Sequence, residues 1–260
     1  MTTPTAARNG QRVPNPPAPA AAQPTSNSKP PVIRPTATIT TMIVCLPDEL
    51  SREPLTAHQL DRHFGVSGTL QPRFWAKPHL YLWQLRHLIG RAKAVKNQPT
   101  YCAGGPAKLL QITGMRHAAG VGAGIRHQLW QQAVQGTKPA QPWVAFHTRH
   151  LTEPGKYSYE QAAADFWQQA RISAMRAHNA ANAGVPLAID ELEMLQAGPT
   201  AYQHYSAMTA LCGDALLTAE RGQLAPASDT FADRMTYLEH AIRYLDGIEN
   251  TGQRLVAVSL

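Results

Sequence analysis

The sequence lacks a long apolar run, contains only three cysteines and has almost no acidic residues in its middle third. No stretch approaches the roughly 18 uninterrupted apolar residues of a membrane-spanning helix, so we expect no contact with a membrane. Cys45, Cys102 and Cys212 are odd in number and far apart, which predicts neither a disulfide framework nor a zinc site. Residues 1–31 contain no apolar segment typical of a secretory signal. We therefore expect a cytoplasmic protein in a reducing environment, with no metal or cofactor.

The charge is distributed unevenly along the chain. The whole sequence carries 24 Lys and Arg against 17 Asp and Glu, a formal net charge of +7. Residues 70–156 contain 12 basic residues and one acidic residue, Glu153, whereas residues 157–260 contain 6 basic and 12 acidic residues. This imbalance predicts that the middle segment contacts a polyanion and that the C-terminal segment does not. The alternative is that the two segments neutralise each other within one fold.

Composition also predicts the domain organisation. Nine of the 21 prolines fall within residues 1–37, among Ala, Thr, Ser and Asn, so residues 1–36 are predicted to be a disordered arm. Residues 37–156 form a basic mixed α/β region, and residues 157–260 form an acidic helical bundle. Apolar residues make up 43% of the chain and charged residues 16%, which excludes a wholly disordered protein and a long coiled coil. The predicted fold class is α+β and mostly α.

Periodicity and end signals predict individual elements. In the basic region we expect strands at 38–46, 108–113 and 143–147, helices at 56–64, 78–96 and 125–135, and a glycine-rich turn up to Gly124. In the bundle we expect helices at 158–183, 189–197 and 200–221, and a last helix from Ser228 or Asp229 to Gly247. Ser158 and Gln161 form a capping box at the start of the first of these helices. The tail, residues 254–260, is predicted to be an edge strand.

The basic region also contains most of the tryptophans, Trp75, Trp83, Trp130 and Trp143, together with Tyr81 and Tyr101. Planar side chains stack on bases, and Lys and Arg neutralise phosphates, so the mixture suits single strands or irregular RNA. The alternative is that these rings belong to the core. The residues predicted to bind nucleic acid are Arg73, Lys77, Arg86, Arg91, Lys93, Lys96, Lys108, Arg116, Arg126 and Arg149. A helix-turn-helix over residues 56–77 is a weaker alternative, because Pro72 would break its second helix.

Residues 114–124 hold four glycines, between a predicted strand and a predicted helix. Such a turn presents backbone N–H groups to an anion, so it is a candidate phosphate site, although it matches neither the dinucleotide fingerprint nor the P-loop. The alternative is that small residues here permit close packing of the backbone.

His147 and His150 are the candidate catalytic residues. Two imidazoles beside a cation, Arg149, have the acid, base and charge needed to cleave RNA through its 2′-hydroxyl without a metal. The leading hypothesis is nonetheless a noncatalytic nucleic-acid-binding subunit of a larger assembly, with other protein subunits bound through its C-terminal helices. A metal-independent endoribonuclease and a protein-only scaffold are the alternatives.

Overall fold

A mixed β-sheet pairs strands from the beginning and the end of the described part of the chain. The computed structural model describes residues 39–47, 57–93, 95–96, 98–181, 184–228 and 230–260, and the arm predicted over residues 1–36 lies outside them. Strand β1 (Thr41–Leu46) pairs in parallel with β6 (Ala215–Leu217) and antiparallel with β8 (Arg254–Ser259). Strands β2 (Thr69–Leu70) and β5 (Gly104–Pro106) pair with β8, and β7 (Gln223–Leu224) pairs with β6. Segments 37–156 and 157–260 therefore both contribute strands to one sheet.

The interior strands of the sheet, β1, β6 and β8, are buried on both faces. Along β1, Ile43 and Cys45 belong to the larger core cluster, whereas Met42, Val44 and Leu46 belong to a second cluster on the opposite face. The second cluster also contains Leu60 of α1 (Ala57–Phe64), together with Val66 and Ile89. Burial on both faces suits the β-branched, continuously apolar sequence of β1. The strand predicted at 38–46 is confirmed as β1 and the helix predicted at 56–64 as α1, while residues 38 and 56 lie outside the described residues.

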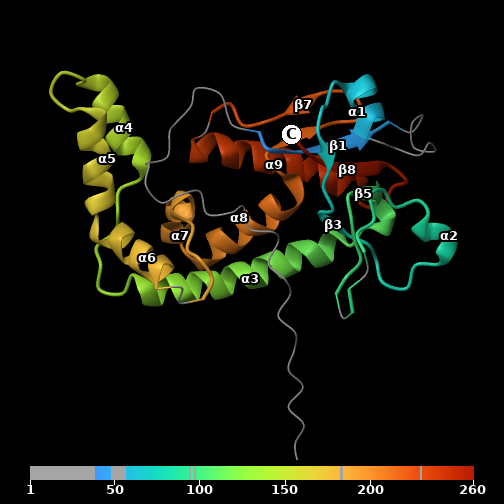
Figure 1. The fold of residues 1–260 in the computed structure, drawn as a ribbon, viewed down its shortest axis with the longest axis horizontal. Helices are drawn as coiled ribbons and strands as arrows, with labels where there is room; N and C mark the ends of the chain where they lie inside the picture. The colour runs from blue at the N-terminus through green and yellow to red at the C-terminus, as the bar shows by residue number, and fades with distance from the viewer. Residues whose placement is uncertain (1–38, 48–56, 94, 97, 182–183, 229) are drawn as a thin grey trace, which may run out of the picture.

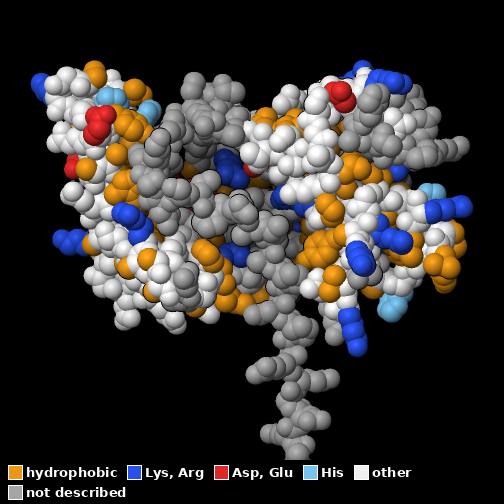
Figure 2. Space-filling view, in the orientation of Figure 1, with side chains coloured by type: hydrophobic (Ala, Val, Ile, Leu, Met, Phe, Trp, Pro, Cys, Tyr) orange, Lys and Arg blue, Asp and Glu red, His pale blue; other side chains and the backbone are white. Residues whose placement is uncertain are grey.

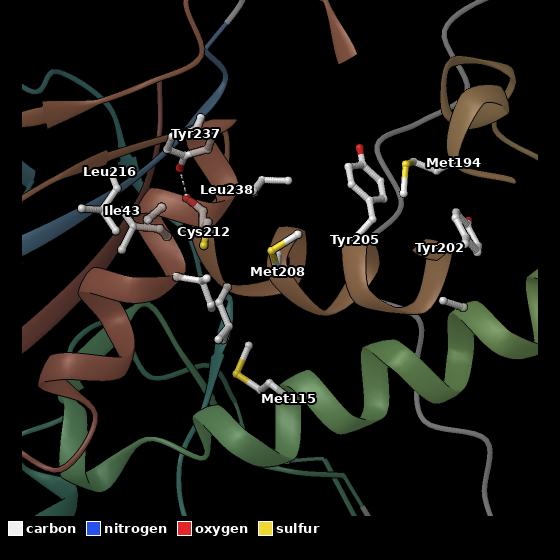
Figure 3. Packing of buried hydrophobic residues seen from close by; sticks show 14 of the residues in the cluster. Ile43, Met115, Met194, Tyr202, Tyr205, Met208, Cys212, Leu216, Tyr237 and Leu238 are labelled. Carbon is white, nitrogen blue, oxygen red and sulfur yellow. Dashed lines mark hydrogen bonds between the residues drawn. The ribbon is translucent and has the colours of Figure 1, made fainter. Parts of the chain in front are cut away.

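Three long helices cover the larger core cluster. Helix α8 (Pro199–Cys212) lies between α3 (Ile112–Ala133) and α9 (Phe231–Ile248), as Figures 1 and 3 show. Met115 of α3 and Met208 of α8 are buried between these helices. The Tyr237 hydroxyl of α9 donates to the Cys212 carbonyl at 2.6 Å. The structure confirms an α+β fold that is mostly α.

The remaining helices form the opposite end of the molecule from α2 (Leu82–Leu85) (Figure 1). They are α4 (Trp143–Thr152), α5 (Tyr159–Gln168), α6 (Ala170–Ala180) and α7 (Leu192–Ala197), the last preceded by a 3-10 turn at Ile189–Glu191. The cap at Ser158 is confirmed, because its hydroxyl accepts the Gln161 N–H at 3.1 Å. The helix predicted over 158–183 is broken at Gln169, whose side chain exchanges two hydrogen bonds with the backbone of Gln141. Within the described part of the chain no helix is long and apolar enough to cross a membrane.

The predicted strand at 108–113 and the glycine turn up to Gly124 are wrong. Residues Ala107–Leu109 form a 3-10 turn, and the glycines lie inside α3, so their N–H groups sit in a helix rather than facing an anion. Helix α3 buries Ala119 and Ala123 on its side facing α8, and a Cβ at Gly124 would fall 2.6 Å from the side chain of Gln203. The close-packing alternative therefore describes these small residues, because burial against α8 outweighs their poor helix propensity.

Three other predicted elements differ from the structure. The strand at 143–147 is helix α4, in which Trp143 and Phe146 share one face and both pack on the Phe166 ring of α5. The helix at 78–96 is reduced to α2, because the chain turns at Gly90 with a φ of +54° and pairs Ile89 with Gly104. The helix-turn-helix over residues 56–77 is also ruled out, because its second helix would lie where the chain forms β2 and β3 (Phe74–Trp75).

The C-terminal boundaries need smaller corrections. Helix α8 ends at Cys212 rather than Arg221, because Gly213 takes a φ of +63° and leads into β6. Thr230 caps α9 by accepting the Asp233 N–H at 3.4 Å, whereas Asp229 lies outside the described residues. The tail predicted as an edge strand is β8, an interior strand with partners on both sides.

Candidate nucleic-acid interface

Residues 77–109 form a long loop whose two ends lie next to each other, here called the basic loop. Its two ends meet, because the Lys77 N–H donates to the Leu109 carbonyl at 2.9 Å and Ala76 forms a bridge with Leu110. Strand β3, which directly precedes the loop, pairs antiparallel with β4 (Tyr101–Cys102), which lies within it. The basic loop is thus held at its base by long-range backbone hydrogen bonds.

Buried residues anchor the basic loop to the sheet. Leu88 belongs to the larger core cluster and Ile89 to the smaller one, so this short segment reaches both. Ile89 and Gly104 exchange backbone hydrogen bonds, and β5 continues from Gly104 along β8. A Cβ at Gly104 would lie 1.8 Å from the Leu255 carbonyl oxygen, so glycine permits this close approach. The backbone beside Arg86, Arg91 and Lys108 is therefore fixed to the core.

Six of the ten predicted nucleic-acid-binding residues lie on this loop. They are Lys77, Arg86, Arg91, Lys93, Lys96 and Lys108, and all six side chains are exposed. The loop sequence contains no Asp or Glu. Figure 2 shows Lys and Arg side chains gathered at the end of the molecule that carries α2, among apolar side chains and without an acidic one beside them on the face shown. The loop therefore presents a surface of one charge sign.

The aromatic residues divide into buried and exposed sets. Trp130 and Trp143 are buried in the core, and Trp75 and Tyr101 are partly buried against each other, with ring centroids 6.2 Å apart. Tyr81 and Trp83, at the start of α2, are 68% and 58% exposed. Their rings lie parallel, with centroids 6.0 Å apart and 5° between the planes. Of the aromatic residues considered from sequence, these two offer ring surface to a ligand.

A pocket of about 420 Å³ lies beside Trp83. Its walls come from α2, from the end of the basic loop and from the turn before β8, and consist of Trp83, Gln84, His87, Pro106, Lys108, Leu109 and Gly252. The Gln84 side-chain oxygen accepts the Tyr81 N–H at 2.9 Å, which orients the amide so that its NH₂ group is the remaining donor. An aromatic face, an amide, an imidazole and a cation thus surround one volume.

The other four predicted cations do not join the basic loop. Arg73 reaches the end of α8, where its Nη2 donates to the Thr209 carbonyl at 2.5 Å and its Nε to the Ala210 carbonyl at 3.1 Å. Burial lowers the pKa of Arg73, and the charge of Asp214 counteracts this. These bonds make Arg73 a cap for the negative end of α8.

Arg116, Arg126 and Arg149 are likewise engaged elsewhere. Arg116 forms an ion pair with Asp246 of α9 at 2.7 Å, and Arg126 donates to the Tyr202 hydroxyl at 3.2 Å. The Arg149 guanidinium lies 4.2 Å from the ring centroid of Tyr157, at the α4 end of the molecule. The first two arginines therefore join α3 to its neighbouring helices.

His147 and His150 lie one turn apart on α4, not in and after a strand. The His150 Nδ1 donates to the Tyr157 carbonyl at 2.8 Å, so its Nε2 is the open ring nitrogen. His147 packs on the Trp143 ring, with centroids 5.9 Å apart. Burial, and next the nearby His150, lower the pKa of His147. Figure 1 places α4 at the opposite end from α2, so the histidines and the basic loop are separate sites.

Comparison with protein-family models, with curated proteins and with solved structures yields no significant match. Across the described ranges, no group of three or more His, Cys, Asp and Glu is placed to hold a metal ion. The candidate interface is therefore described only from the residues of this chain. Sequence analysis did not identify Gln84 and Gly252 as part of it, because only the long-range pairing of the loop brings them to one pocket.

Proposed function

We propose that this protein is a noncatalytic nucleic-acid-binding subunit, and that the basic loop holds the phosphate backbone. The observation that carries the proposal is the set of six exposed Lys and Arg on a loop closed at its base and free of acidic residues. Such an array binds a polyanion by neutralising phosphates and releasing their counterions. Because Leu88, Ile89 and Gly104 hold the loop to the core, the backbone beside them loses little conformational entropy on binding.

The test is a salt titration of binding to single- and double-stranded RNA and DNA. If all six cations contact phosphates, the slope of log K against log salt is about −4 for single strands, and affinity falls roughly 300-fold between about 50 and 200 mM salt. A binding constant insensitive to salt would contradict the proposal. Failure to bind any nucleic acid at low salt would favour the protein-only scaffold instead.

We propose further that the C-terminal segment binds other protein subunits and that the protein is cytoplasmic. Residues 157–260 carry 12 acidic against 6 basic residues, a balance that repels nucleic acid and supports a role of the C-terminal segment in binding other protein subunits. Cys45, Cys102 and Cys212 are all buried free thiols, a state that suits the reducing cytoplasm.

The histidine pair supports a second candidate function, a metal-independent endoribonuclease. The favouring observation is geometric: the His150 Nδ1 donates to the Tyr157 carbonyl and leaves its Nε2 open, one helical turn from His147, whose pKa is lowered by burial and by the nearby His150. RNA cleavage by the wild type that disappears in His147→Ala and His150→Ala would establish it. Intact RNA after incubation with the wild type would exclude it.

A further inference from the structure

We infer that Tyr81, Trp83 and the pocket beside Trp83 hold unpaired bases, so that the ligand of the basic loop is single-stranded nucleic acid. This inference rests on the proposed function and specifies its ligand. It goes beyond charge, because phosphate contacts alone do not distinguish a single strand from a duplex.

The first support is the exposure of the two rings. A large aromatic side chain is usually buried, yet Tyr81 and Trp83 are 68% and 58% exposed and lie parallel to each other. Every base has a flat face, and in a single strand that face is available, whereas in a duplex it is covered by the neighbouring base pairs. Two parallel, exposed rings on one short segment suit successive unpaired bases.

The second support is the chemistry of the pocket. Its volume of about 420 Å³ is within the range of small-molecule sites, and Trp83 forms one wall. Gln84 and His87 bring hydrogen-bonding groups suited to a base edge, and Lys108 brings a charge suited to the phosphate of the same nucleotide. Gly252 forms another part of the wall, where the lack of a side chain leaves room.

An anionic membrane is the competing ligand for a basic surface with exposed apolar residues. Leu82, between the two rings in sequence, is 87% exposed and would contribute to insertion into lipid as much as Trp83 would. Binding to a lipid surface does not, however, require a pocket lined by an amide, an imidazole and a lysine. The pocket therefore favours the nucleic acid, and Leu82 provides the variant that separates the two ligands.

The experiment measures the affinity of the full-length protein for oligouridine and oligothymidine and for RNA and DNA duplexes of equal length. We expect Trp83→Ala and Tyr81→Ala each to weaken single-strand binding by about 10- to 100-fold and duplex binding by less than about 2-fold. Trp83→Phe keeps most of the affinity because it keeps a ring. Leu82→Ala, the matched control, changes single-strand affinity by less than about 2-fold. Binding of oligouridine quenches tryptophan fluorescence in the wild type, and this quenching is reduced in Trp83→Phe.

The remaining outcomes of this experiment lead to different conclusions. Equal losses for single strands and duplexes in Trp83→Ala, or no loss for either, would overturn the inference and leave the proposed function standing. Absence of binding to every nucleic acid at low salt would overturn both. Binding to phosphatidylserine vesicles that Leu82→Ala weakens as strongly as Trp83→Ala, and that oligouridine does not displace, would assign the surface to a membrane instead.

Discussion

The backbone N–H of Lys77 donates to the carbonyl of Leu109 at 2.9 Å, and this bond brings together the two ends of the basic loop. The loop between them reaches both core clusters through Leu88 and Ile89. The exposed Arg86 and Arg91 therefore project from a backbone that the core holds on both sides of Leu88 and Ile89. Substitutions that remove charge from the loop should therefore weaken nucleic-acid binding without lowering the free energy of unfolding.

Removing two cations from the basic loop should weaken nucleic-acid binding without destabilising the fold. In Lys93→Gln/Lys96→Gln, both side chains are exposed, so the free energy of unfolding should change by less than about 0.5 kcal/mol. The slope of log K against log salt should become shallower by about 1.4 for single strands if both lysines contact phosphate.

The matched control is Lys138→Gln/Lys156→Gln, which removes the same charge at the end of the molecule opposite α2. We expect its salt slope to equal that of the wild type. Equal effects of the two pairs would mean that net charge, rather than the basic loop, controls binding.

Arg73 should contribute to stability rather than to binding. Arg73→Ala removes the hydrogen bonds to the Thr209 and Ala210 carbonyls at the end of α8, at a cost of about 1–3 kcal/mol in urea unfolding. In conditions where the variant is folded, its salt slope should match that of the wild type. The exposed Arg86→Ala should show the reverse: unchanged stability and a shallower slope. A salt slope for Arg73→Ala as shallow as that of Arg86→Ala would contradict this division.

Gly104 should be intolerant of substitution because β5 approaches β8 closely there. A Cβ would meet the Leu255 carbonyl oxygen at 1.8 Å, so Gly104→Ala should separate the strands and cost about 2 kcal/mol or more. Gly155→Ala is the control, since nothing lies within 4 Å of its added Cβ. Thermal or urea unfolding measures both variants, and equal stability of Gly104→Ala and the wild type would show that β5 can move away from β8 at no cost.

The fold was predictable where local signals and burial agree. The β-branched run of β1 and the Ser158 cap of α5 are of this kind. Prediction failed where tertiary contacts outweigh propensity: Gly120 and Gly124 lie within α3 because that helix packs on α8. The segment beginning at Trp143 has the strand-like composition of a short apolar run, yet its apolar side chains pack at helical spacing.

The candidate site, like the fold, was predictable from the sequence only in part. The charge imbalance predicts the six cations of the basic loop together with four others, because composition depends on the chain alone. Composition could not separate them from Arg73 or Arg116, which differ only in the carbonyls and carboxylate that long-range packing places beside them. Nor could it separate Trp83 from the buried Trp130.

Glu191 should make stability depend on pH. Its Oε2 accepts the Tyr202 hydroxyl at 2.6 Å, and burial raises the pKa of Glu191 despite that hydrogen bond and the nearby Arg126. Below the unfolded pKa of about 4.5, both states hold the proton and the carboxyl costs nothing. As the pH rises above it, the unfolded chain ionises first, so stability is lost until the folded carboxyl has also ionised.

In Glu191→Gln this loss should be absent, because the amide is neutral at every pH and its oxygen still accepts the Tyr202 hydroxyl. Urea unfolding from about pH 4 to pH 8 should therefore show the variant gaining stability relative to the wild type as the pH rises. Glu239→Gln on the exposed face of α9 controls for the loss of one surface charge. A wild type that gains stability over the variant with rising pH would mean that the carboxylate form, held by Tyr202 and Arg126, is the one that the fold favours.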